Sequence, residues 1–191
     1  SLPITAEKTS TWQVKSWIRK LADHTLDNHY EIVMVRVDDR LIHGQILEAW
    51  VPFLKASCII VANDGVAGDL FRETVLRMAV PSEMEVIIRP IDELSGHYPC
   101  SEENGKRTLV LFSSVSDAVR AYESGFHYHR LNIGNVYSEN FALTCLPSVL
   151  LGAGEIDDLQ ALMENDVTVE LRRVPKERSS DLRKFLKKRK P

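Results

Sequence analysis

From Glu31 onward, the chain alternates short runs of β-branched and apolar residues with stretches in which apolar residues recur at helical spacing. This alternation is typical of βαβ units, because two parallel strands need a crossover connection that is usually a helix. It predicts an α/β fold with an open, mostly parallel, Rossmann-like sheet of about six or seven strands and helices on both faces. The strands are expected at Glu31–Val37, Ser57–Ala62, Met84–Arg89, Thr108–Phe112, Arg130–Gly134, Leu143–Leu150 and Thr168–Val174.

Amphipathic segments fill the intervals between these strands. After the first strand, Ile46, Leu47 and Trp50 share one face, and Pro52 is expected to kink or shorten the helix that carries them. The later helices are expected at Leu70–Ala79, Val115–Ser124 and Glu155–Asn165, with a final basic helix from Asp181.

A separate helix is predicted before the sheet, because Val14, Trp17, Ile18 and Leu21 recur at helical spacing over residues 11–24. We therefore divide the chain into an N-terminal helical extension (1–30), a main domain (31–175) and a basic helical tail (176–191). The extension is expected to pack on its own domain or a neighbouring subunit, or else to dock another protein. A homo-oligomer is compatible with the sequence, which does not specify one.

Composition excludes several classes of function. The 191 residues carry a formal net charge of -3, without the basic bias of a nucleic-acid-binding domain. The three cysteines are far apart in sequence, so reduced thiols are favoured over a zinc site or a disulfide framework. Apolar runs are strand-sized, well short of the roughly 20 residues that span a bilayer, and the first residues do not lead us to expect a secretory signal. A cytoplasmic protein is expected.

Charged residues concentrate where the first strand ends and the following helix begins, in the run Arg36–Gln45. Open α/β sheets bind ligands at this end of their strands. A neutral imidazole is a good nucleophile toward phosphorus, so His43 is the candidate nucleophile. Arg40 and the backbone N–H groups at the helix start, at Gly44 and Gln45, are candidates to hold phosphoryl oxygens.

One of two carboxylates, Asp38 or Asp39, is expected to accept a hydrogen bond from His43 and so to fix its tautomer. We favour Asp39 as the supporting group. Spacing alone leaves an alternative open, because a loop histidine flanked by charges is more often a solvated surface residue.

The run Val35–Gln45 resembles the signature of the mannose/sorbose-family IIB component of the bacterial phosphotransferase system. Further ordered motifs extend the resemblance over residues 31–175, which a chance match to one short pattern would not do. These motifs are Ile59–Asp64, Val66–Asp69, Arg72–Pro81, Leu109–Asp117, Leu131–Gly134 and Glu170–Pro175.

The resemblance implies a phosphoryl relay. His43 would take phosphate on Nδ1 from the histidine of a IIA phosphocarrier and pass it to a sugar arriving through the IIC/IID membrane permease. It places Arg40 in the phosphate-binding loop and requires neither a metal nor another cofactor. It also implies the strand order 3-2-1-4, with Ser113 and Ser114 facing His43 to bind phosphate, although such serines more often cap helices.

Two alternatives remain at this stage. Departures from the family at Ser113–Ser116 and at Gly134–Val136 leave a regulatory phosphohistidine or partner-binding module possible, in which no sugar receives the phosphate. A nucleotide-binding enzyme is disfavoured, because no glycine-rich phosphate loop follows a strand. The basic residues of the tail predict a solvated helix face or contact with an anionic membrane surface. The identity of the sugar is not encoded in any motif that we recognise.

Overall fold

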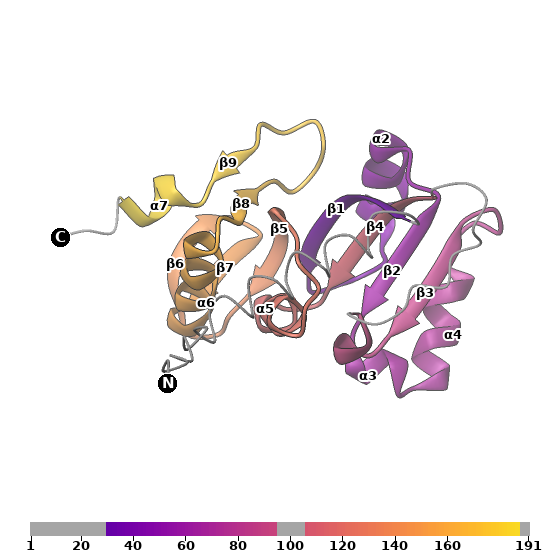
Figure 1. Ribbon diagram of the computed structural model, residues 1–191. Coiled ribbons are helices and arrows are strands. Elements are labelled where there is room, and N and C mark those ends of the chain that lie inside the picture. Colours follow the sequence, from indigo (N-terminus) through magenta and orange to yellow (C-terminus); the bar gives the residue numbers. More distant parts are fainter. Residues whose placement is uncertain (1–29, 95–105, 188–191) are drawn as a thin grey trace, which may run out of the picture.

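The computed structural model describes residues 30–94 and 106–187, and the helix expected over residues 11–24 lies outside them. Within these ranges the chain forms a nine-stranded sheet flanked by helices (Figure 1). The strands are β1 (Tyr30–Asp38), β2 (Cys58–Ala62), β3 (Glu85–Arg89), β4 (Lys106–Phe112), β5 (Arg130–Tyr137), β6 (Phe141–Leu146), β7 (Val149–Gly152), β8 (Thr168–Leu171) and β9 (Ser180–Asp181). The helices are η1 (Ile46–Trp50), α2 (Val51–Leu54), α3 (Asp64–Ala67), α4 (Leu70–Met78), η2 (Ile91–Glu93), α5 (Val115–Glu123), α6 (Ala153–Glu164) and α7 (Arg183–Lys187).

The centre of the sheet is parallel, in the order β3-β2-β4-β1-β5. The strand order 3-2-1-4 expected from the family was therefore wrong, because β4 lies between β2 and β1. Val110 of β4 pairs with both Ile60 of β2 and Val35 of β1. The last five residues of β4 are buried, which fits a central strand covered on both faces.

Two antiparallel additions account for the strands beyond the six or seven expected. The strand predicted over Leu143–Leu150 is instead a hairpin, in which Pro147 and Ser148 form the turn between β6 and β7. Proline cannot donate a ladder hydrogen bond, so a break at this position has a simple cause. The chain after β8 returns as β9, which pairs with β8, and then buries Leu182 completely.

Helices cover both faces of the sheet, as predicted (Figure 1). On one face, η1, α2 and α3 bury Ile46, Trp50, Leu54 and Val66 against the strands. On the other face, α5 and α6 pack on the sheet through residues such as Val115 and Leu159. None of the described helices is long and apolar enough to cross a membrane.

The helix after β1 is irregular around Pro52, where a kink or shortening was expected. Its first part, η1, is a π-helix, and α2 ends after one turn at Lys55, whose backbone is left-handed with φ 51°. Pro52 lies in the first turn of α2, where its missing N–H is least costly. Single π-helical turns of this kind occur often beside functional sites.

The sheet contains a switch point between the adjacent strands β1 and β4. The chain leaves β1 toward η1 and α2 on one face, whereas it leaves β4 toward α5 on the other face. The two loops therefore diverge at the carboxyl edge of the sheet, where open α/β sheets bind their ligands. The loop after β1 is the one that carries His43.

Candidate functional site

The loop after β1 is held in place by two apolar side chains. The N–H of Leu41 donates to the carbonyl of Asp38 at 2.9 Å, and Leu41 has a positive φ of 53°, which is rare for a bulky residue. Leu41 and Ile42 are both buried in the core. This anchorage leaves Arg40 and His43 at the surface on either side of the buried pair, and the side chain of His43 is 15% exposed.

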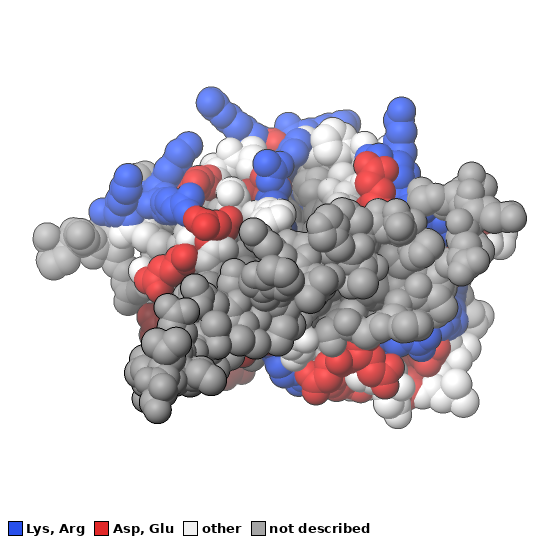
Figure 2. Space-filling view, viewed as in Figure 1, with Lys and Arg blue, Asp and Glu red and all other residues white. Residues whose placement is uncertain are grey.

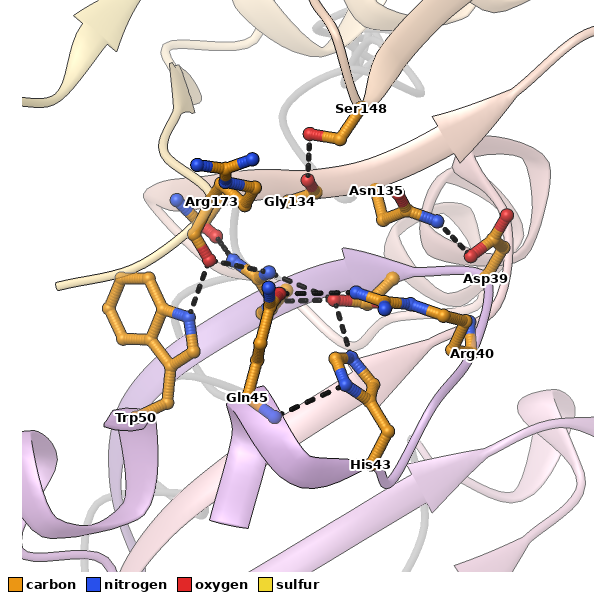
Figure 3. A network of polar contacts seen from close by, with 12 residues as sticks. Asp39, Arg40, His43, Gln45, Trp50, Gly134, Asn135, Ser148 and Arg173 are labelled. Atoms are coloured by element: carbon orange, nitrogen blue, oxygen red, sulfur yellow. Dashed lines mark hydrogen bonds and ion pairs between the residues drawn. The ribbon is translucent and has the colours of Figure 1, made fainter. Parts of the chain in front are cut away.

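The His43 imidazole has different partners at its two nitrogens (Figure 3). The backbone N–H of Gln45 donates to Nδ1 at 3.3 Å, while Nε2 lies 3.1 Å from Oδ2 of Asp38. Because an N–H points at Nδ1, that atom carries the lone pair of the neutral ring, and the proton is on Nε2 facing the carboxylate. Of the two ring nitrogens, Nδ1 is therefore the one that can act as a nucleophile.

Asp38 is fully buried and lies at the centre of the site. Nη2 of Arg36 approaches its Oδ2 at 2.9 Å, and Nε of Arg40 lies 3.5 Å from its Oδ1. Burial by itself raises the pKa of Asp38, but its contacts with His43 and Arg36 outweigh that effect and hold the pKa below the usual value. The carboxylate is therefore ionised at neutral pH.

Asp39, the carboxylate favoured from the sequence, is directed away from this cluster. Its Oδ1 accepts a hydrogen bond from Nδ2 of Asn135 on β5, and its backbone N–H donates to the Asn135 carbonyl at 3.2 Å (Figure 3). Asp38 is the last residue of β1, whereas Asp39 is the first residue of the turn that follows, so their side chains have different surroundings. The contact expected of Asp39 is thus made by Asp38, the other carboxylate considered.

Arg36 is the buried cation beneath Asp38. Besides Asp38, its guanidinium donates to the carbonyls of Arg172 at 2.9 Å and Arg173 at 3.1 Å, and also to Oδ1 of Asn132. Burial lowers its pKa, although the charge of Asp38 opposes the change. A Cβ atom added at Gly134 would overlap this guanidinium, so glycine is needed there for Arg36 to fit.

Trp50 joins the helix after His43 to the chain after β8. Its Nε1 donates to the carbonyl of Arg173 at 3.0 Å. The indole ring also lies 5.1 Å from the guanidinium carbon of Arg36 and 5.5 Å from that of Arg172, both within cation–π range. Trp50 therefore fixes η1, and with it the backbone that follows His43, against a segment more than 120 residues away.

The solvent side of His43 is lined by the residues expected to bind phosphate. Nη2 of Arg40 donates to Oε1 of Gln45 at 3.1 Å, and the Arg40 side chain is 48% exposed. A Cβ atom at Gly44 would meet only Oε1 of Glu48, at an ordinary 3.9 Å, so packing alone does not require glycine there. Arg40, Gly44 and Gln45 thus lie together with His43 in one loop.

The protein-family model for the PTS system sorbose subfamily IIB component matches residues 32–191 of this chain. The chain belongs to this family. The predicted resemblance and the Rossmann-like fold of the IIB component are both confirmed. The match extends through the residues that we assigned to a separate tail.

Relatives of this IIB component agree over most of its length. It is 31% identical over 156 residues to the fructose-specific EIIB component of Bacillus subtilis, which covers 82% of this chain and 96% of that protein. It is 30% identical over 151 residues to the sorbose-specific EIIB component of Lacticaseibacillus casei, with 79% and 92% covered. The crystal structure of the IIBSor domain of the sorbose permease from Klebsiella pneumoniae superimposes with a TM-score of 0.74 at 27% identity, covering 84% and 98% of the two chains. Nothing among these relatives supports the regulatory alternative.

Ser113 and Ser114 of the IIB component follow β4, which is adjacent to β1 as expected. Oγ of Ser113 accepts from Nδ2 of Asn63 at 2.7 Å and donates to Oδ2 of Asp117 at 2.8 Å. Oγ of Ser114 accepts the N–H of Asp117 at 3.0 Å and so caps α5. Both hydroxyls thus have side-chain or backbone partners, on Asn63 after β2 and on Asp117 in α5, and the cap alternative is confirmed for Ser114.

The buried half of the site, in which Arg36 and Trp50 support Asp38 and the His43 loop, was not predicted from the sequence. Arg36 lies within an apolar, β-branched run, and a charged residue in such a strand must be paired when it is buried. With Asp38 two residues later on the same face, this spacing was the available signal. The contribution of Trp50 depends on the distant Arg173 carbonyl and had no local signal. Among the described residues, no cluster of three or more His, Cys, Asp or Glu is arranged to hold a metal ion.

Proposed function

We propose that His43 carries the phosphoryl group in this IIB component. It would receive the group from a phosphohistidine of a IIA phosphocarrier and pass it to a sugar at a IIC/IID permease. The observation that carries the proposal is the ring geometry, in which Nδ1 faces the Gln45 N–H with its lone pair while Nε2 faces Asp38.

In the first transfer, the Nδ1 lone pair of His43 forms a bond to phosphorus as the phosphorus–nitrogen bond of the donor histidine breaks. The electron pair of the broken bond stays on the donor imidazole, and the Nε2 proton of His43 remains beside Asp38. The reaction exchanges one phosphorus–nitrogen bond for another, so the protein mainly supplies positioning and charge stabilisation. Arg40 and the Gly44 N–H would hold the phosphoryl oxygens, and the Gln45 N–H would turn from Nδ1 to a phosphoryl oxygen as the Nδ1 lone pair bonds to phosphorus.

Asp38 would stabilise the positive charge that develops on the imidazole ring when Nδ1 bonds to phosphorus. Arg36 and Trp50 are positioning residues in this scheme, because they hold Asp38 and the start of η1 rather than touching the phosphoryl group. We assign to Asp38 the supporting role that the sequence had suggested for Asp39, and retain Asp39 as a residue that ties the loop to Asn135.

In the second transfer, a sugar hydroxyl would attack phosphorus as the bond to Nδ1 breaks. The electron pair of that bond would return to Nδ1, which leaves a neutral imidazole, and the hydroxyl proton would be released to water. Relatives of this chain are named for fructose, sorbose and mannose, which supports a sugar as the final acceptor. The mannose-specific EIIAB component of Escherichia coli, of which 49% is matched, supports a IIA domain as the donor.

We also propose that the protein works at the cytoplasmic face of the membrane, beside its permease. Lys and Arg side chains gather over β9 and α7, at the upper left of Figure 2. A basic surface is attracted to anionic lipid headgroups, which supports this location.

Incubation with phosphoenolpyruvate and the upstream phosphocarriers, including IIA, tests the assignment of His43. Intact-mass measurement should detect one added phosphoryl group that is lost in acid, and His43→Ala should abolish the addition. His129→Ala is the matched control, because His129 is exposed and should not change the labelling. Equal labelling of His43→Ala and the wild type would exclude His43 as the acceptor.

A further inference from the structure

Helix α4 differs from the other long helices of the fold because none of its residues is buried. It instead exposes four large apolar side chains, which we call the α4 patch. Their exposed fractions are 80% for Leu70, 77% for Phe71, 49% for Val75 and 81% for Met78. Large contiguous apolar surfaces of this kind usually belong to a binding site rather than to free surface.

The α4 patch occupies one side of the helix. At 100° per residue, its four members fall within an arc of about 140°. Leu76, on a different side, packs on the core beneath. The charged residues Arg72, Glu73 and Arg77 also fall outside the arc and engage in ion pairs. The outward face of α4 is therefore the apolar one, the reverse of the usual arrangement in a surface helix.

The α4 patch is continuous with the His43 loop. A shallow pocket of about 250 Å³ lies between them, lined by Leu41, Val66, Phe71, Arg72, Val75 and Leu76. Leu41 is the buried anchor of the loop, two residues before His43. At the lower right of Figure 2, where Figure 1 places α3 and α4, white surface of uncharged residues lies beside the red and blue surface of charged residues.

We propose that the α4 patch is the docking surface for the phosphorylated donor protein, an inference that rests on the function proposed above. A donor histidine must bring its phosphorus to about 3 Å from Nδ1, so the donor must cover the surface that flanks the His43 loop. Exposed aromatic and methionine side chains with an arginine nearby, as Phe71, Met78 and Arg72 are here, are typical of protein interfaces. Arg40 and Arg72, 48% and 65% exposed, would attract the anionic phosphoryl-bearing partner.

A second copy of this chain fits the same surface less well. Because the pocket beside the patch includes Leu41, a copy seated there would lie over the loop through which every donor and acceptor must reach His43. The occupant is therefore a protein that binds during transfer and then leaves.

The test uses one double variant, which carries both Leu70→Asp and Met78→Asp, and compares its phosphorylation by two phosphoryl donors. Both side chains are at least 80% exposed, so the variant should fold normally. With phosphorylated IIA as donor, the KM for IIA should rise at least about tenfold, equivalent to about 1.4 kcal/mol. Labelling by phosphoramidate, a small donor that needs no docking surface, should match the wild type.

Phe141→Asp is the matched control. Phe141 is 50% exposed on β6, at the opposite end of the sheet from the β3 edge, and its replacement should leave the KM for IIA unchanged. An unchanged KM in the α4 variant would overturn the docking proposal while leaving His43 as the acceptor. So would a defect confined to transfer into a sugar through the permease, or a loss of self-association in light scattering. Failure of the wild type to be labelled by IIA would instead reject the proposed function itself.

Discussion

Two arginine–aspartate pairs lie near the carboxyl edge of the same sheet. In the buried pair, Arg36 and Asp38 are 2.9 Å apart and neither side chain is exposed. In the exposed pair, Arg120 and Asp64 are 2.5 Å apart, but their side chains are 41% and 49% exposed. Judged by distance alone, the exposed pair would contribute more to stability than the buried pair. Solvent reverses that order, because water screens the exposed charges, whereas removing one member of a buried pair strands the other.

Replacing Arg36 should have the largest effect. Arg36→Met keeps much of the side-chain volume but leaves Asp38 without its buried cation, and it removes the donors to two backbone carbonyls. We expect a loss of about 3–5 kcal/mol in the free energy of unfolding, measured by urea denaturation. A loss below about 1 kcal/mol would mean that His43 and Arg40 suffice to compensate Asp38.

Asp38→Asn should slow phosphorylation of His43 and, because it removes the anionic partner of buried Arg36, should also lower the free energy of unfolding. The amide has no charge to stabilise the imidazole during transfer, and its NH₂ group can face Nε2 and favour the wrong tautomer. We expect labelling by phosphorylated IIA to slow by about 10–100-fold in single-turnover measurements, as for other partners that orient a histidine. Asp39→Asn is the comparison variant and should label at nearly the wild-type rate. If it proved the slower of the two, the supporting role would return to Asp39.

The buried pair should also dominate the acid sensitivity of the fold. The pKa of Asp38 is lowered in the folded state, so its stabilising contribution is complete above the unfolded value of about 3.9 and is lost as pH falls through the folded value. Urea midpoints measured from about pH 6 to pH 2 should therefore fall less steeply for Asp38→Asn than for the wild type. A slope that Asp64→Asn reduced more would contradict the ranking by burial.

Arg120→Ala should have the smallest effect. Although Arg120 contacts both Asp64 and Asp92, all three side chains are substantially exposed. We expect a loss of about 1 kcal/mol or less, reduced further by added salt, in the same urea experiment. A larger and salt-independent loss would show that the exposed cluster is better shielded than its surface area indicates.

The sequence predicts the elements best where a continuous run of buried residues determines a strand. The strands β1 to β4 begin and end within two residues of their predicted limits, because buried β-branched runs determine them. The hairpin of β6 and β7 was misjudged as one strand, since the apolar run around Pro147 continues on both sides of the turn. The position of β4 between β2 and β1 depends on long-range pairing, which local pattern does not contain.

The candidate site also has a part that can be predicted from local sequence and a part that cannot. The solvent-facing residues His43, Arg40 and Gln45 are close in sequence, and the family motif identified them. The layer beneath them depends on the strand face of Asp38 and on backbone carbonyls that come from the far end of the domain. No short window of sequence contains both halves.

Gly134 carries a consequence for sequence variation. Since even one methyl group at this position would occupy the space of the Arg36 guanidinium, residues 36 and 134 are constrained as a unit. A homologue with alanine at 134 must move or replace the Arg36 guanidinium, and an engineered library that varies position 134 while keeping Arg36 will be enriched in destabilised chains. Joint substitution at the two positions is the evolutionary route by which a descendant of this fold could replace the buried Arg36 with an apolar side chain.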